Sequence, residues 1–181
     1  MSNTNVLKQL LIERSVKKGT FVLASGKSST FYVDARLTTM SPQGMLEIGA
    51  LGLDMLVSRG WVPDSVGGLT LGADPIAYAL TYASASRSRP LRAFTVRKEP
   101  KAHGTEGRIE GPFRNGDHVV IVEDVITTGK SALQAIDAVE QAGGRILGVL
   151  ALVDRQDGGR EAIGYRGYDV ASLTTISELL G

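Results

Sequence analysis

The sequence predicts an α/β fold, in which helices flank a parallel β-sheet. Two observations support this prediction. First, short apolar runs typical of strands alternate with segments that have the apolar spacing of helices from residue 65 to residue 153. Second, the run Val119-Val120-Ile121-Val122 is wholly apolar, as expected for a strand buried on both faces of a parallel sheet. Right-handed crossovers join strands that alternate with helices, so we expect helices on both faces of the sheet.

Local signals justify the elements in chain order. Leu7, Leu10 and Leu11 have the spacing of an amphipathic helix, and Ser41 followed by Pro42 is typical of a helix start. Polar turns and glycines separate the remaining apolar segments. The expected elements are a helix over residues 6–19, strands over 20–24 and 30–33, a helix over 42–58, a strand over 65–69, a helix over 75–85, strands over 91–96 and 119–122, a helix over 131–141, strands over 146–153 and 168–175, and a helix over 176–180.

Length and composition indicate one domain. The chain has 181 residues, of which 43% are apolar and 22% charged, and this suffices for a sizeable core. We assign residues from about 60 to 155 to the core, and the ends, about 1–40 and 160–181, to a small hood over it. The net charge of +1 provides no overall attraction for nucleic acid or membranes. The absence of cysteines excludes disulfides, thiolate metal sites and cysteine nucleophiles. Without signal-peptide features or a membrane-length apolar run, we expect a cytoplasmic protein.

A pair of acids and a hydroxyl-rich turn follow the strand at 119–122. Glu123 and Asp124 come where a parallel strand would reach the carboxyl edge of the sheet, which is where such sheets bind ligands. The turn at 127–129 leads into a helix whose N-terminus suits a phosphate. Carboxylates would repel a bare phosphate, but they accept hydrogen bonds from sugar hydroxyls and steady a Mg²⁺-bound group. The arrangement predicts a ribose 5-phosphate site.

Two alternatives fit parts of this stretch. Gly129-Lys130-Ser131 matches the end of a P-loop, but that motif requires a glycine at the position of Asp124, so this interpretation is disfavoured. The other alternative is an ordinary strand–turn–helix unit without a ligand, since a motif match is a hypothesis.

The whole stretch from residue 119 to 131 closely resembles the signature of type I phosphoribosyltransferases for 5-phosphoribosyl 1-diphosphate (PRPP). The resemblance implies the fold of that family, a parallel sheet core with a hood built from the two ends of the chain. It implies that Glu123 and Asp124 bind the ribose hydroxyls and that Asp124 is catalytic. It also implies a binding site for the 5′-phosphate formed by Val125, Ile126, Thr127, Thr128, Gly129, Lys130 and Ser131.

A basic segment follows the predicted strand at 91–96. Few of its residues, 97–108, could pack in a core, so it can close over a polyanion; a solvated connection is the alternative. Fixed cations there would stabilise the charge of a leaving pyrophosphate. The segment resembles the catalytic loop of orotate phosphoribosyltransferases, which implies that Arg97, Lys98, Lys101 and His103 bind PRPP. The resemblance further implies that Lys101 and His103 are catalytic and come from the neighbouring subunit of a homodimer.

Three further segments, at residues 25–34, 67–75 and 152–159, resemble motifs of the same family in the same order. They imply an orotate site that contains Lys27, Tyr32, Thr127 and Arg155, and a pyrophosphate loop that contains Thr70, Leu71 and Gly72. The resemblance also implies a cis peptide bond between the first two residues of that loop.

The residues of these segments also have plainer explanations. The guanidinium of Arg155, at a strand end, suits a planar carboxylate, but arginine is also a common surface residue. Tyr32 can border a pyrimidine or pack in the core. Two positions depart from the family pattern, since Ala24 and Gly72 stand where some members have a lysine. Pyrophosphate binding would then depend more on the basic segment.

The resemblance implies a pentosyltransferase that transfers ribose 5-phosphate from PRPP to orotate in pyrimidine biosynthesis, releasing pyrophosphate and orotidine 5′-phosphate. It implies Mg²⁺ as cofactor, carried by PRPP near Asp124 rather than by direct protein ligands. One rival is a purine or another pyrimidine phosphoribosyltransferase. Another is a PRPP-sensing regulator that binds nucleic acid, which would need a basic face or a DNA-binding domain; the sequence shows neither.

Overall fold

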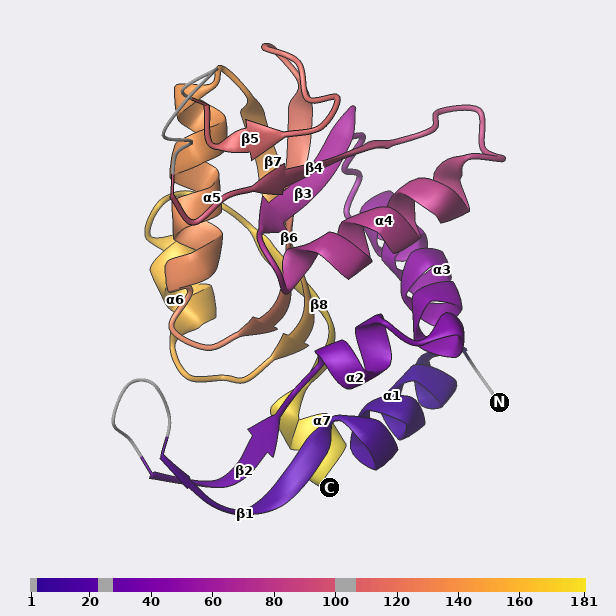
Figure 1. The fold of residues 1–181 in the computed structure, drawn as a ribbon, viewed down its shortest axis with the longest axis vertical. Coiled ribbons are helices and arrows are strands. Elements are labelled where there is room, and N and C mark those ends of the chain that lie inside the picture. Colours follow the sequence, from indigo (N-terminus) through magenta and orange to yellow (C-terminus); the bar gives the residue numbers. More distant parts are fainter. Residues whose placement is uncertain (1–2, 23–27, 100–106) are drawn as a thin grey trace.

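The computed structural model describes residues 3–22, 28–99 and 107–181, which form two sheets with helices around them (Figure 1). The elements are α1 (Asn3–Arg14), β1 (Val16–Val22), β2 (Ser28–Val33), α2 (Arg36–Thr39), α3 (Pro42–Ser58), β3 (Ser65–Leu69), α4 (Ala73–Ser84), β4 (Arg92–Val96), β5 (Ile109–Glu110), β6 (His118–Ile126), α5 (Lys130–Gln141), β7 (Arg145–Asp154), α6 (Gly159–Gly164), β8 (Val170–Thr175) and α7 (Ile176–Leu180).

The main sheet has six strands in the order β5-β4-β3-β6-β7-β8. All neighbouring pairs are parallel except β4 and β5, which are antiparallel. The α/β class and the mostly parallel sheet expected from the sequence are therefore confirmed. Strand β8 belongs to this sheet, so the sheet extends beyond the range of about 60–155 that we assigned to the core. The division into core and hood stays a prediction.

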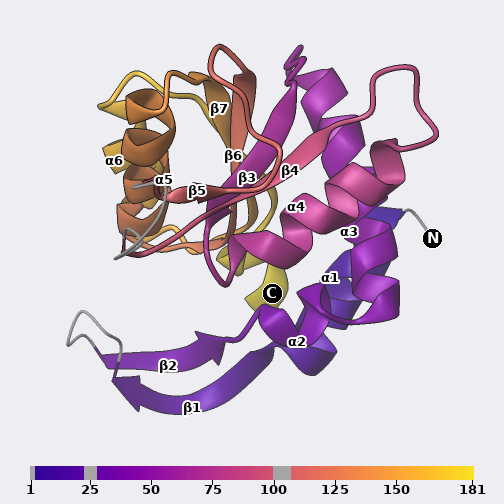
Figure 2. The same cartoon turned by 45° about the horizontal axis from the view of Figure 1, so that its top comes forward.

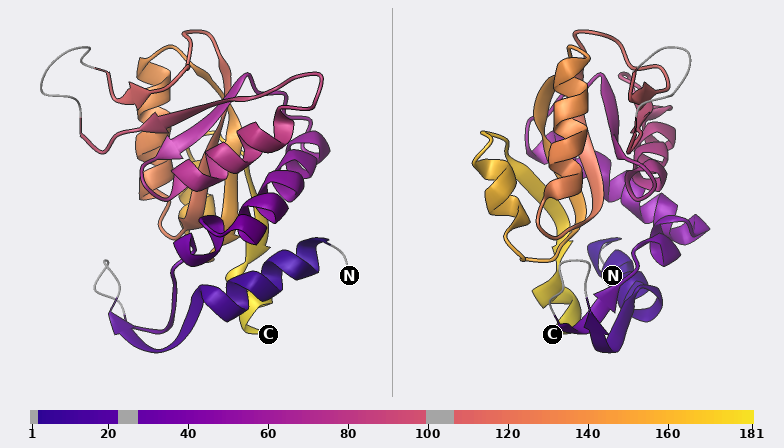
Figure 3. Two further views of the ribbon diagram at one scale, coloured as in Figure 1. Left: turned by 45° about the vertical axis from the view of Figure 1, so that its right-hand side comes forward. Right: turned by 60° about the vertical axis from the view of Figure 1, so that its left-hand side comes forward.

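The central strand β6 is buried on both faces, because its side chains alternate between two hydrophobic clusters. Val120 and Val122 belong to a cluster that includes Ile48 of α3 and Leu80 of α4. Val119 and Ile121 belong to a second cluster that includes Ile136 of α5. Helices α3 and α4 thus cover one face and α5 covers the other, as Figure 3 also shows. The unbroken apolar run of β6 follows from this burial on two sides.

The N-terminal segments differ from the sequence prediction. Helix α1 ends at Arg14, and β1 begins at Val16, before the expected start at Thr20. Pairing with β2 sets this boundary, since the register begins with Val16 opposite Val33. Figure 2 shows the β1–β2 hairpin apart from the main sheet, beside α1 and α2. Three short elements, α2, β5 and α6, were not predicted because they are too short to show a period.

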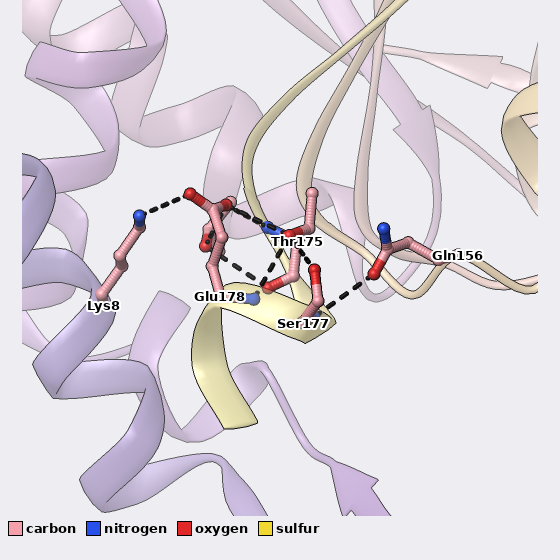
Figure 4. A network of polar contacts seen from close by, with 6 residues as sticks. Lys8, Gln156, Thr175, Ser177 and Glu178 are labelled. Carbon is pink, nitrogen blue, oxygen red and sulfur yellow. Dashed lines mark hydrogen bonds and ion pairs between the residues drawn. The ribbon is translucent and has the colours of Figure 1, made fainter. Parts of the chain in front are cut away.

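The end of the chain is tied to α1 and to the turn after β7. Lys8 of α1 forms an ion pair with Glu178 of α7 at 2.7 Å (Figure 4). Thr175 and Glu178 form a capping box, in which each side chain accepts a hydrogen bond from the other's backbone N–H. The backbone N–H of Ser177 donates to the side-chain oxygen of Gln156 at 3.3 Å. These contacts hold α7 against segments that are distant in sequence.

Candidate active site

A cavity of about 390 Å³ lies at the carboxyl edge of the main sheet. Strands β3, β4 and β6 are parallel and end at this edge, and the segments that directly follow them contribute to the cavity wall. The β3–α4 turn contributes residues 70–72, β4 leads to Lys98, and β6 leads to Thr127 and Ser131. The end of β2, beginning at Tyr32, completes the wall. The topology thus brings together the segments that the sequence singled out separately.

The turn from β6 to α5 forms a smaller cavity of about 220 Å³ lined by Glu123, Val125 and residues 126–132. Gly129 begins the helix with a φ of +80°, a conformation that favours glycine. Gly129 has no side chain that could cap the helix. The first N–H groups of the twelve-residue helix α5 therefore face this turn without a capping side chain. Three hydroxyl residues, Thr127, Thr128 and Ser131, line the same cavity. The turn can therefore bind a phosphate.

The two acids at the end of β6 differ in environment. Glu123 is only 7% exposed, and its Oε2 atom is buried without a hydrogen-bond partner among the described residues. Burial, reinforced by the neighbouring Asp124 carboxylate, raises the pKa of Glu123 well above its usual range. Asp124 lies in the cavity wall, and one carboxylate oxygen accepts a hydrogen bond from the Val125 N–H at 2.8 Å. The pair can accept hydrogen bonds from ligand hydroxyls or contact a cation.

The β3–α4 turn approaches this acid pair closely. The peptide bond between Thr70 and Leu71 is cis, as the resemblance implied. At Gly72 an added Cβ would lie 2.6 Å from the Cγ and Oδ1 atoms of Asp124, so the carboxylate rests against the bare backbone of the turn. Asp74 accepts hydrogen bonds from the Thr70 hydroxyl at 2.7 Å and from the Thr95 hydroxyl at 2.9 Å. These bonds tie the turn to β4.

Arg155 follows β7 and is buried, with 7% exposure. Its guanidinium carbon lies 4.8 Å from the centre of the Phe31 ring, and Nη2 donates to the Ser29 hydroxyl at 3.0 Å. Its Nε atom lies 3.0 Å from a carboxylate oxygen of Asp157 but makes no hydrogen bond with the described residues. Arg155 is therefore not an ordinary surface arginine. Its contacts with β2 place a fixed cation in the cavity wall.

The remaining predicted residues fall into three groups. Tyr32 lines the cavity, is 40% exposed and packs against Phe21, with ring centres 5.8 Å apart. Arg97 lines neither of these two cavities, and its guanidinium pairs with Glu110 at 3.4 Å. The last group, which lies outside the described residues, consists of Ala24, Lys27, Lys101 and His103.

Sequence reasoning missed four residues of the site region. Asp34 and Arg36 line the cavity, Phe31 stacks on the buried guanidinium, and Asp74 fixes the β3–α4 turn. Phe31, Asp34 and Asp74 stood within recognised motifs, but nothing local in the sequence indicated their contacts. No cluster of three or more His, Cys, Asp or Glu that could hold a metal occurs within the described ranges.

Comparisons with known proteins agree with this geometry. A family model for the phosphoribosyl transferase domain matches residues 73–171. The chain is 46% identical over 177 residues to an orotate phosphoribosyltransferase of Aquifex aeolicus, with 96% of each chain covered. A solved structure of Mycobacterium tuberculosis orotate phosphoribosyltransferase in complex with PRPP is 37% identical, has a TM-score of 0.82 and matches over 98% of each chain. The chain belongs to the orotate phosphoribosyltransferase family.

Proposed function

We propose that the protein transfers ribose 5-phosphate from PRPP to orotate, which yields orotidine 5′-phosphate and pyrophosphate. One observation carries the proposal: the β6–α5 turn, the acid pair and the buried arginine all contribute to the wall of the main cavity. The names of the relatives support it, and the M. tuberculosis relative was solved with PRPP bound. The reaction would be a step of pyrimidine biosynthesis.

Each part of the cavity has a role in this reaction. The β6–α5 turn would hold the 5′-phosphate through the free N–H groups of α5. Glu123 and Asp124 would accept hydrogen bonds from the ribose hydroxyls, which would supply the partner that the Oε2 atom of Glu123 lacks among the described residues. Arg155 would bind the carboxylate of orotate. Held in this way, the N1 atom of orotate attacks the anomeric carbon as the bond to pyrophosphate breaks.

We also propose Mg²⁺ as the cofactor. The donor set fits it, because Mg²⁺ commonly uses one or two carboxylates together with substrate phosphates and water. Asp124 and the unpartnered oxygen of Glu123 lie in the wall where such an ion, carried by PRPP, would be held. The bound ion would neutralise charge on the departing pyrophosphate.

The assembly and the basic segment belong to the same proposal. Lys101 and His103 would cover the pyrophosphate from the neighbouring subunit of a homodimer, on the strength of the family resemblance. No helix of the described residues is both long and apolar enough to cross a membrane. The cytoplasmic location expected from the sequence stays a prediction.

A substrate panel tests the function directly. The purified protein is assayed with PRPP, Mg²⁺ and each of orotate, uracil, hypoxanthine and adenine, and the products are separated by chromatography. We expect turnover with orotate alone. Turnover with another base and none with orotate would support the rival phosphoribosyltransferases, and no turnover with any base would support a regulator.

A variant tests the acid pair. Replacing Glu123 by Gln and Asp124 by Asn together should abolish efficient use of PRPP and leave the fold intact. Asp137→Asn serves as the control, because Asp137 pairs with Arg166 on the surface, outside both cavities. Native turnover of the double variant at limiting and saturating PRPP would refute the assignment of the ribose site.

A further inference from the structure

Arg36 lines the same cavity although it lies outside the signature stretch and the basic segment. It is the first residue of α2, and its side chain is 47% exposed. The guanidinium forms a two-point contact with Asp34: Nε donates to Oδ1 at 2.8 Å and Nη2 donates to Oδ2 at 3.1 Å. The Asp34 carboxylate and, more weakly, that of Asp124 raise the pKa of Arg36, so the guanidinium also lies within the field of the Asp124 carboxylate.

The backbone that carries Arg36 is rigidly held. The Asp34 N–H donates to the Ser15 carbonyl at 2.9 Å, and the Thr38 hydroxyl contacts the Ser15 hydroxyl at 2.7 Å. Ala35 and Thr38 are buried on either side of Arg36. The Arg36 side chain extends from this fixed backbone, and the Asp34 carboxylate holds its guanidinium. It is therefore preorganised for binding.

The position of Arg36 associates it with the pyrophosphate loop. Arg36, Asp34 and Leu71 line both the main cavity and a neighbouring cavity of about 460 Å³. The phosphate turn of β6–α5 contributes to the main cavity but not to this neighbour. The guanidinium therefore lies on the side of the Thr70–Gly72 turn.

The turn itself provides no cation. Its residues are Thr70, Leu71 and Gly72, and a side chain at position 72 would displace the Asp124 carboxylate. Two other described cations line the wall: Arg155, which is engaged by Phe31 and Ser29, and Lys98, which follows β4 rather than the turn. A polyanion over this turn thus needs a positive charge from elsewhere.

Arg36 has donors to spare for such a ligand. A guanidinium carries five N–H donors in a fixed fork, and Asp34 uses one on Nε and one on Nη2. The donors on Nη1 and the second donor on Nη2 make no hydrogen bond within the part of the chain that the structure describes. This fork matches the geometry of phosphate oxygens.

Building on the function proposed above, we propose that Arg36 binds the pyrophosphate group of PRPP and that Asp34 is its positioning residue. Arg36 takes the place of a cation on the Thr70–Gly72 turn, where the contact between Gly72 and Asp124 leaves no room for one.

The test uses the reverse reaction, in which orotidine 5′-phosphate and pyrophosphate form orotate and PRPP. In Arg36→Gln the KM for pyrophosphate should rise about tenfold, as expected for one hydrogen bond to a charged group at a half-exposed site, while the KM for orotidine 5′-phosphate changes less than about twofold. Arg36→Lys keeps the charge but not the fork, so its KM for pyrophosphate should lie in between. The control Arg166→Gln removes an arginine that is also paired and half-exposed, and should change neither KM.

A KM for pyrophosphate that stays at the wild-type value, or equal rises for both substrates, would overturn the proposal. Should Arg36→Gln fail to fold, Arg36→Lys carries the same test. Calorimetric titration of wild-type and variant protein with magnesium pyrophosphate separates this inference from the proposed function, because it needs no turnover. Weaker pyrophosphate binding in the Arg36 variants supports the inference whatever the base specificity. Absent binding to the wild type, or equal binding to all proteins, contradicts it.

Discussion

Replacing Gly72 by Ala tests whether the position of the Asp124 carboxylate controls the use of PRPP. Gly72 has φ −64° and ψ −40°, a right-handed helical conformation that alanine adopts without strain. The methyl group would lie 2.6 Å from the Cγ and Oδ1 atoms of Asp124 and 2.8 Å from Oδ2. The substitution therefore acts on one functional group and leaves the backbone of the turn unchanged.

The size of the effect follows from the contact distance. Ordinary van der Waals contact begins at 3.4 Å, so the carboxylate must retreat from 2.6 Å by about 0.8 Å. Misplacing a reacting or positioning group by ~1 Å costs roughly 10²-fold in rate. Stability should change little, because a glycine-to-alanine gain of ~0.4–1 kcal/mol offsets part of the strain of the new contact. The thermal midpoint should stay within about 4 °C of the wild type.

The assay measures kcat/KM for PRPP at saturating orotate, together with thermal unfolding. Gly164→Ala is the matched control, because an added Cβ there meets no atom within 4 Å. The double variant Gly72→Ala, Asp124→Ala should be no worse than Asp124→Ala alone, since the methyl group then has no carboxylate to displace. Wild-type kcat/KM in Gly72→Ala, or a further loss in the double variant, would refute the reasoning.

Three further predictions concern other parts of the molecule. Arg155→Leu should raise the KM for orotate by roughly thirtyfold or more and leave the KM for PRPP nearly unchanged, since truncating a buried charge partner costs roughly 2–5 kcal/mol; equal changes would indicate misfolding. Mixing Lys101→Ala and Asp124→Asn proteins under subunit exchange should restore activity well above either alone, and no gain after confirmed exchange would mean that the basic segment serves its own subunit. Lys8 and the Thr175 N–H lower the pKa of Glu178 from 4.5 to about 2, so its contribution to stability is present above pH 4.5 and is lost as the pH falls toward 2. Measured with denaturant at pH 6, the free energy of unfolding of Lys8→Met should therefore be lower than that of the wild type, by less than ~1 kcal/mol because the pair is so exposed. Near pH 2 the two should be equal; a difference that does not depend on pH would contradict this.

The signals that predicted correctly were local. Strand β6 is buried on both faces, so the residues that point to either face must be apolar. This burial is visible in the sequence as an unbroken apolar run. The β6–α5 turn was predictable because glycine and hydroxyl residues are typical of a turn between a strand and a helix. The same reasoning placed the start of β1 wrongly, since Val16 is in a strand only through its pairing with Val33.

By itself, the sequence determined the α/β class, the order of the main strands and helices, and the hydroxyl-rich β6–α5 turn, because periodicity and turn chemistry are properties of neighbouring residues. Tertiary structure alone decided which side chains meet. The sheet order brings Gly72 against Asp124, β2 brings Phe31 onto Arg155, and the buried base of α2 directs Arg36 to the cavity wall. Such contacts depend on strand order and packing between distant segments, and no local pattern of residues records them.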